Sequence, residues 1–195
     1  MAVTKKCHLY LIALLSLCCL TVHAQEQPKA TVSVKRQDSH FQVSASIMLP
    51  VKQCIAYGLL TDYASLPDYI PGMLEIHAER ISNNLVKVRQ VGEAEVLFFH
   101  VKMAALLEMT EIPNQRIIFK QTEGDLASYS GESNLLETSD GTKLTYDASL
   151  SFKGFVPYFL ASAVLEDEVE KRFEAIAKEA RSRKNKNLPD CGAKQ

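Results

Sequence analysis

The stretch FQVSASIMLPVKQCIAYGLLTDYASLPDYIPGM, residues 41–73, contains the most informative pattern in the chain. Residues 41–49 alternate apolar and polar side chains, which predicts a strand with one buried face. Pro50 ends that strand and suits the first turn of a helix, where a missing N–H costs no hydrogen bond. Apolar residues then recur at helical spacing over residues 51–60, so we predict a helix directly after the strand.

The second half of this stretch predicts another short helix and then a turn. Asp62 can cap a helical turn that begins at Tyr63. Pro67 disfavours helical geometry at the residue before it, and Pro71-Gly72 is a turn signal. Residues 51–72 are therefore predicted to form a kinked pair of short helices and not a flexible linker.

Strand patterns in series follow, and a long helical pattern comes last. The predicted strands are 74–82, 85–91, 96–110, 116–123, 127–138 and 142–153, the second of them broken at Gly92. Asp140-Gly141 is a strong hairpin signal between the last two. Residues 158–182 contain neither glycine nor proline, and they carry an apolar stripe with charged residues around it. The stripe consists of Leu165, Val169, Phe173, Ile176 and Ala180.

This order of elements predicts an α+β fold built on one antiparallel sheet. Sequential hairpins of about seven strands would curl around the long terminal helix, each strand turning one apolar face toward it. One helix is narrow against so many strands, so we expect the concave face to keep an apolar cavity. The helix pair at 51–72 would close one end of that cavity.

The order and three stretches resemble the START-like (SRPBCC) superfamily, whose members share the Bet v 1-like helix-grip fold. The stretches are residues 41–73, the hairpins ending in KLTYDASLSFKGFVP (143–157), and the terminal helix. The segment TDYASLPDYIPG (61–72) is most similar to polyketide cyclase/dehydrase and coenzyme Q-binding proteins. The resemblance implies a helix-grip domain and a hydrophobic ligand, and it brings no invariant catalytic motif.

The first 24 residues have the pattern of an export signal. Lys5 and Lys6 precede an apolar run of about 14 residues, shorter than the roughly 20 needed to cross a bilayer as a helix. Val22-His23-Ala24 offers a cleavage site, and a retained membrane anchor is the alternative. We expect a signal peptide at 1–24, a flexible leader at 25–40, a START-like domain at 41–182 and a polar tail at 183–195. The protein would then be periplasmic or secreted.

Composition argues against several classes of function. Without Lys5 and Lys6 the chain has 20 basic and 23 acidic side chains, a net charge of −3 that does not favour nucleic acid. The histidines after the signal, His40, His77 and His100, lack metal-ligand spacing. No nucleophile elbow, phosphate loop or dinucleotide motif occurs in the sequence. We therefore predict no metal, no cofactor and no catalytic residue.

Cys54 and Cys191 are the cysteines that follow the signal. Two cysteines do not make a disulfide framework, so we expect a buried Cys54 and a loose Cys191. A bridge between them is the alternative in an oxidising compartment.

An apolar cavity with a few polar anchors is the usual site for a small ligand. We expect it to be lined by Phe99, Met103, Tyr129, Tyr146, Leu150 and Phe152 from the sheet and by Leu165, Val169 and Phe173 from the helix. Its entrance would be formed by Tyr63, Tyr69, Ile70 and Met73. Ordinary core packing is the alternative for each of these side chains.

Together these observations predict an exported protein that binds or carries a hydrophobic small molecule, such as a lipid, a quinone-like isoprenoid or a polyketide. One alternative is a cyclase- or aromatase-like enzyme in the same cavity, with Tyr129 and Tyr146 donating to a carbonyl. Another is an interaction protein whose core has collapsed. A transient contact with a membrane is also left open, and the sequence does not indicate the ligand or the oligomeric state.

Overall fold

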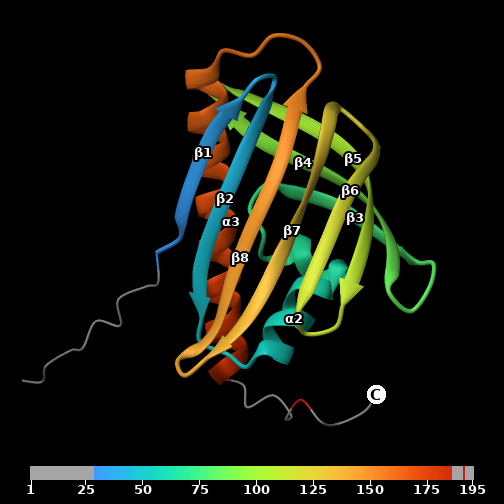
Figure 1. Cartoon of the computed structure of the whole chain (residues 1–195), viewed down its shortest axis with the longest axis vertical. Coiled ribbons are helices and arrows are strands. Elements are labelled where there is room, and N and C mark those ends of the chain that lie inside the picture. The colour runs from blue at the N-terminus through green and yellow to red at the C-terminus, as the bar shows by residue number, and fades with distance from the viewer. Residues whose placement is uncertain (1–28, 186–190, 192–195) are drawn as a thin grey trace, which may run out of the picture.

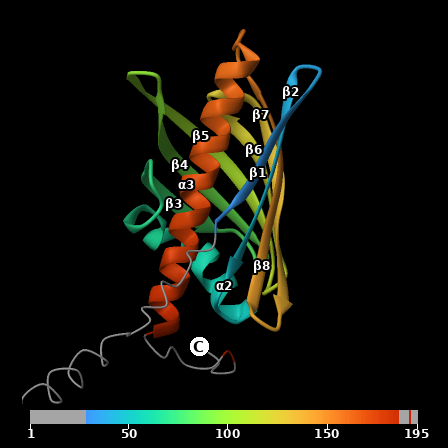
Figure 2. The ribbon, with the colours of Figure 1, turned by 90° about the vertical axis from the view of Figure 1, so that its left-hand side faces the viewer.

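The computed structural model describes residues 29–185 and Cys191, so the predicted export signal lies outside the described residues. Eight antiparallel strands form one curved sheet in the order β1-β2-β8-β7-β6-β5-β4-β3. A long helix, α3 (Tyr158–Asn185), lies along the concave side of the sheet (Figures 1 and 2). This is the helix-grip α+β fold that the order of elements predicts.

The strands agree with the alternating patterns, with differences mainly at their ends. They are β1 (Thr31–Gln37), β2 (His40–Leu49), β3 (Met73–Arg80), β4 (Leu85–Val96), β5 (Phe99–Ile112), β6 (Arg116–Gly124), β7 (Leu126–Thr138) and β8 (Gly141–Phe152). Gly92 does not end β4 as predicted, because it stays in the ladder between Met73 of β3 and Met103 of β5.

Residues 31–37 form strand β1, so the prediction of a flexible leader over 25–40 is wrong for this part. β1 pairs with β2 along its whole length, with Val34 opposite Val43. Val34 is buried, and its carbonyl oxygen accepts a hydrogen bond from Tyr158 Oη at 3.3 Å. Two valines alternating with polar residues are too weak a local pattern to indicate a strand. The pairing with β2 and the contact with α3 supply the stability that the pattern does not reveal.

Two short helices follow β2, as predicted: α2 (Gln53–Thr61) and the 3-10 helix η1 (Tyr63–Asp68). Asp62 stands between them, but its side chain does not cap η1, so that prediction is wrong. Its carbonyl oxygen accepts a hydrogen bond from Ser65 N at 3.0 Å, and its carboxylate lies 3.7 Å from Arg183 Nη2 of α3. The carboxylate therefore pairs with the terminal helix.

The helix α3 packs its apolar stripe against the sheet. Phe173 and Ile176 are buried in the core, and Ala177 and Ala180 are fully buried. The small alanine side chains let α3 approach the sheet closely, and the helix continues past the predicted end at residue 182. Within residues 29–185, no helix combines the length and the apolar character needed to span a membrane.

Cys54 and Cys191 form a disulfide, with their Cα atoms 5.9 Å apart. The expectation of a free Cys54 and a loose Cys191 is therefore wrong, and the bridge that was the alternative is present. The Cα separation lies in the usual range for a disulfide. The two cysteines are 137 residues apart in sequence, so the bond joins α2 to the segment beyond α3.

Candidate ligand-binding site

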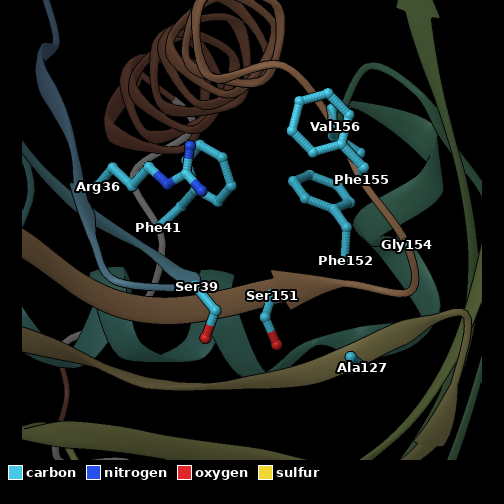
Figure 3. A pocket seen from close by; sticks show the side chains of 9 residues that line it. All are labelled: Arg36, Ser39, Phe41, Ala127, Ser151, Phe152, Gly154, Phe155 and Val156. Atoms are coloured by element: carbon cyan, nitrogen blue, oxygen red, sulfur yellow. The ribbon is translucent and has the colours of Figure 1, made fainter.

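A pocket lies where the β1–β2 turn meets the chain that leaves β8 (Figure 3). Its volume is about 290 Å³, which is at the lower end for small-molecule sites. Figure 3 shows Arg36 and Phe41 on one side of the pocket, and Phe152 and Phe155 on the other. Three phenylalanines supply the large side chains of the walls, and Arg36, Ser39 and Ser151 add polar groups.

Two residues with left-handed backbone geometry shape this pocket. Gly154 has a φ of 100°, which turns the chain away from the end of β8. Asp38 has a φ of 55° in the β1–β2 turn, and its carbonyl oxygen accepts a hydrogen bond from Arg36 Nε at 2.9 Å. The ring of Phe41 meets Phe152 edge to face at 5.5 Å and stacks on Tyr158 at 5.9 Å. These contacts hold Phe41 and Phe152 in place.

Exposed apolar side chains occur on two segments at this end of the molecule. Phe98, in the β4–β5 turn, is 92% exposed, and Phe155, between β8 and α3, is 86% exposed. Figure 2 shows the β4–β5 turn and the start of α3 at the same upper end. We call the group the apolar rim; its members are Leu97, Phe98, Phe99, Val101, Phe155, Tyr158 and Phe159. Exposed apolar side chains at one end of a molecule are candidates for a site of interaction.

Aromatic side chains fill the interior beside the middle of α3. The hydroxyl groups of Tyr129 and Tyr146 share a hydrogen bond of 2.8 Å. The ring of Phe119 lies 4.8 Å from that of Tyr129 and 5.8 Å from that of Tyr146, which meets Phe173 at 6.0 Å. At this level the space in which we expect a cavity is therefore occupied by side chains.

Burial raises the pKa of both phenols. For Tyr129 the effect of burial is partly offset by the hydrogen bond with Tyr146 and by the positive charge of Arg172. For Tyr146 burial is again the main cause, the neighbouring Tyr129 raises the pKa further, and Arg172 lowers it. Both phenols are therefore protonated at neutral pH, where they can donate hydrogen bonds but cannot act as bases.

The structure brings many of the predicted ligand-binding residues together. Most of them pack against one another in the core and do not line the pocket. Leu150 and Phe173 are buried, and Tyr129, Tyr146, Phe152, Leu165 and Val169 pack against the buried clusters. Phe152 also lines the pocket. Met103 is partly buried on β5, whereas Phe99 belongs to the exposed rim. The pocket is completed by residues that sequence reasoning missed, above all Phe41, Phe155 and Val156.

The four predicted entrance residues lie beside α2 and η1, and none of them lines the pocket. Ile70 is buried, Met73 is partly buried, and Tyr69 Oη donates a hydrogen bond to the carbonyl oxygen of Leu59 at 2.8 Å. Figure 1 shows α2 at the end of the sheet opposite the β1–β2 turn. The pocket therefore opens at the other end of the molecule from the predicted entrance.

Tyr63, the remaining predicted entrance residue, is held by Glu111. Glu111 was not identified from the sequence. Glu111 is only 3% exposed, and its carboxylate accepts hydrogen bonds from Tyr63 Oη at 2.8 Å and Tyr57 Oη at 3.4 Å. Arg80 Nη2 lies 2.9 Å from the same carboxylate. Burial, with Glu111 adding to it, raises the pKa of Tyr57 to about 12 and raises that of Tyr63 as well. The cluster fixes η1 to the sheet.

A second pocket, of about 150 Å³, lies over the β5–β6 bulge, and its lining contains no aromatic side chain. Across the part of the chain that the structure describes, no three His, Cys, Asp or Glu side chains gather as metal ligands would. The aromatic pocket with its apolar rim is accordingly the candidate site.

Comparison with known proteins agrees with this fold. The family model for polyketide cyclase/dehydrase and lipid transport matches residues 49–177. No curated protein matches the chain. The Streptomyces aromatase/cyclase Zhui is 14% identical, with a TM-score of 0.63 over 80% of this chain and 99% of that one.

Two further solved structures are similar to the same degree. The STAR-related lipid transfer protein of Xanthomonas axonopodis is 12% identical, with a TM-score of 0.62 over 77% of this chain and 98% of that one. A START superfamily protein of Mycobacterium smegmatis is 13% identical, with a TM-score of 0.61 over 73% of this chain and 98% of that one. At these identities the structural likeness establishes the fold. The family match covers most of the chain, which therefore belongs to the polyketide cyclase/dehydrase and lipid transport family.

Proposed function

We propose that this protein is an exported carrier or binding protein for a hydrophobic small molecule. The observation that carries the proposal is the aromatic pocket formed by Phe41, Phe152 and Phe155, which opens at the end of the molecule that bears the apolar rim. An apolar ligand seated there would exchange water for aromatic side chains. The family to which the chain belongs includes lipid transport in its description, which supports the same reading.

Desolvation would supply most of the affinity. Apolar surface contributes about 25 cal/mol for each Å² removed from water, so a ligand that buries about 200 Å² gains about 5 kcal/mol before the costs of association. A pocket of about 290 Å³ is small for a long lipid. A larger ligand would have to displace Phe155, whose side chain is mostly exposed and can move with little loss of packing.

A cyclase- or aromatase-like enzyme is the second candidate, because Tyr129 and Tyr146 form a buried pair of protonated phenols. Such phenols could donate a hydrogen bond to a carbonyl whose oxygen becomes negative during enolisation. This candidate predicts turnover of a polyketide-like substrate that is lost in Tyr129→Phe and Tyr146→Phe while folding is retained. Unchanged turnover in both variants would exclude these phenols from the reaction.

We propose that residues 1–24 direct the export. Two observations support this: the charged start followed by a short apolar run, and the disulfide between Cys54 and Cys191, a bond typical of oxidising compartments. Terminal sequencing of the protein from its source is the test. A mature chain that begins at Gln25 is expected, and an intact Met1 on a cytosolic protein would contradict export.

The binding proposal is tested by blocking the pocket. Ala127 is exposed and lines the pocket, beside a bulge in the β7–β8 ladder, so Ala127→Trp should fill the pocket without disturbing the core. Wild-type protein should enhance the fluorescence of the apolar dye N-phenyl-1-naphthylamine, and Ala127→Trp should abolish most of that signal. Ala78→Trp, at an exposed position of β3, is the matched control and should bind the dye normally. Equal binding by both variants would place the site elsewhere.

A further inference from the structure

The pocket has a charged side chain that stands next to its aromatic wall. Among the described residues that line the pocket, Arg36 alone carries a charge. Arg36 lies directly opposite Phe41 in the β1–β2 ladder, so the two side chains leave the same face of the sheet. Phe152 meets the ring of Phe41 edge to face, with ring centroids 5.5 Å apart. The register of the ladder therefore places a guanidinium group beside an apolar surface.

The guanidinium group of Arg36 has donors that no protein group uses. Its Nε donates to the carbonyl oxygen of Asp38 at 2.9 Å, a bond that orients the side chain on the β1–β2 turn. Further N–H donors lie on Nη1 and Nη2. Across the part of the chain that the structure describes, neither Nη atom meets an acceptor, and no carboxylate pairs with Arg36. These two groups are open to a ligand.

The hydroxyl groups at the pocket, in contrast, already have partners. Ser39 Oγ shares a hydrogen bond with His40 Nδ1 at 3.2 Å. Ser151 Oγ shares one with Ser128 Oγ at 2.7 Å. A polar atom of a ligand would therefore find its free donors on the guanidinium group and not on the serines.

The acids nearest to the pocket in sequence do not face it. Asp38 and Asp125 flank two of the lining segments, but neither is among the residues that line the pocket. Asp38 contributes its backbone carbonyl to Arg36, and the carboxylate of Asp125 accepts a hydrogen bond from Ala104 N at 2.7 Å. The positive charge at the pocket is therefore not balanced by an acid in the pocket lining.

A single planar cation favours one class of head group. The Nη1 and Nη2 groups lie in one plane and present parallel N–H bonds, which match the two oxygens of a carboxylate. One carboxylate balances one guanidinium charge, whereas a cationic head would be repelled. Apolar walls exclude water from part of the site, and hydrogen bonds between ions strengthen where water is excluded.

We propose that the pocket binds an amphiphile with a medium-length apolar chain and an ionised carboxylate head. The head would accept hydrogen bonds from Nη1 and Nη2 of Arg36, and the chain would lie against Phe41, Phe152 and Phe155. The volume of about 290 Å³ suits a medium-length chain better than a long one. The assignment rests on the proposed carrier function and adds the chemical class of the cargo.

The test compares three ligands of equal chain length by displacement of N-phenyl-1-naphthylamine at about pH 8: decanoate, 1-decanol and decylammonium. They differ only in the charge and hydrogen-bonding of the head group. Wild-type protein should bind decanoate roughly tenfold more tightly than 1-decanol, as expected for hydrogen bonds between charged groups that exceed the cost of desolvating the carboxylate. Decylammonium should bind most weakly.

Variants of Arg36 show whether the preference comes from this side chain. Arg36→Met keeps an apolar stem without the charge, and it should lower decanoate affinity roughly tenfold while 1-decanol affinity stays within about twofold. Arg36→Lys keeps the charge without the planar pair of donors, so it should retain only part of the preference. Lys35→Met is the matched control, because it removes the same charge from an exposed neighbour whose side chain leaves the opposite face of the sheet. It should preserve the preference.

The outcomes separate the two proposals. If neither the dye nor any of the three ligands binds wild-type protein, the carrier function fails and the assignment fails with it. If wild-type protein binds decanoate no more tightly than 1-decanol, the carrier function stands and the carboxylate assignment is overturned, whatever the variants do. A preference that survives in Arg36→Met, or that is lost equally in Lys35→Met, would overturn Arg36 as the binding group.

Discussion

Tyr63 Oη donates a hydrogen bond to Glu111 Oε1 at 2.8 Å, and both residues are buried. The bond joins η1, which directly follows α2, to strand β5. Because Tyr57 and Arg80 also face this carboxylate, the α2–η1 end of the molecule is fixed by a charged cluster. The pocket and the apolar rim lie at the other end of the molecule.

Removal of the Tyr63 hydroxyl should destabilise the protein. Tyr63→Phe takes a donor from a buried carboxylate, which costs about 1–3 kcal/mol in the free energy of unfolding. Urea denaturation at neutral pH measures the loss, which should exceed that of Tyr158→Phe, because the Tyr158 hydroxyl donates to the backbone carbonyl of Val34 at 3.3 Å and not to a carboxylate. Unchanged stability of Tyr63→Phe would show that the cluster does not fix η1.

The same cluster predicts sensitivity to alkali. The pKa of Tyr57 is raised from its ordinary value of 10.0 to about 12 in the folded protein. The unfolded chain therefore loses this proton first, so the stabilising contribution is complete below pH 10.0 and is lost as the pH rises toward 12. The free energy of unfolding should fall over this range, and less steeply in Tyr57→Phe. An equally steep fall in the variant would contradict the role of Tyr57.

The apolar rim should contact lipid surfaces during ligand exchange. Phe98→Ser combined with Phe155→Ser removes its two most exposed aromatic side chains, and the change in stability should stay within about 0.5 kcal/mol because both positions are exposed. Co-sedimentation with phosphatidylcholine vesicles should drop severalfold. Leu136→Ser, which removes an exposed leucine on β7, is the matched control and should behave as wild type. Equal sedimentation of all three proteins would contradict contact between the apolar rim and lipid.

The disulfide should stabilise the fold. Loss of a native disulfide from a small domain typically costs 2–5 kcal/mol, and a long closed loop favours the upper half of that range. Cys54→Ser, Cys191→Ser and reduction of the wild-type protein should all lower the melting temperature, and by similar amounts. A reduced protein that melts at the same temperature as the oxidised one would show that the bond adds nothing.

Local patterns predicted the sheet well because each strand from β2 to β8 has one apolar face. They failed where stability comes from a partner elsewhere in the chain. β1 is held by its pairing with β2 and by Tyr158 of α3, neither of which is visible in its own sequence. The Cys54–Cys191 bridge was hidden for the same reason.

The site was harder to predict than the fold. Residues 97–109 have apolar side chains at odd positions, and Glu111 continues that parity, so an inward-facing acid could have been noticed. The position of the pocket could not have been predicted from the sequence, because it depends on how Phe119, Tyr129 and Phe173 fill the interior. Periodicity shows which side of a strand faces the core, but it does not show where packing leaves a gap.

Native mass spectrometry of the protein isolated from its source compartment tests the central claim most directly. The account predicts that wild-type protein carries a hydrophobic small molecule, seen as added mass that solvent extraction removes, and that Ala127→Trp carries little or none of it. Restoring the extracted molecule should raise the melting temperature of the wild type. A wild-type protein of bare mass, whose melting temperature no class of hydrophobic ligand raises, would contradict the claim that this pocket holds a ligand.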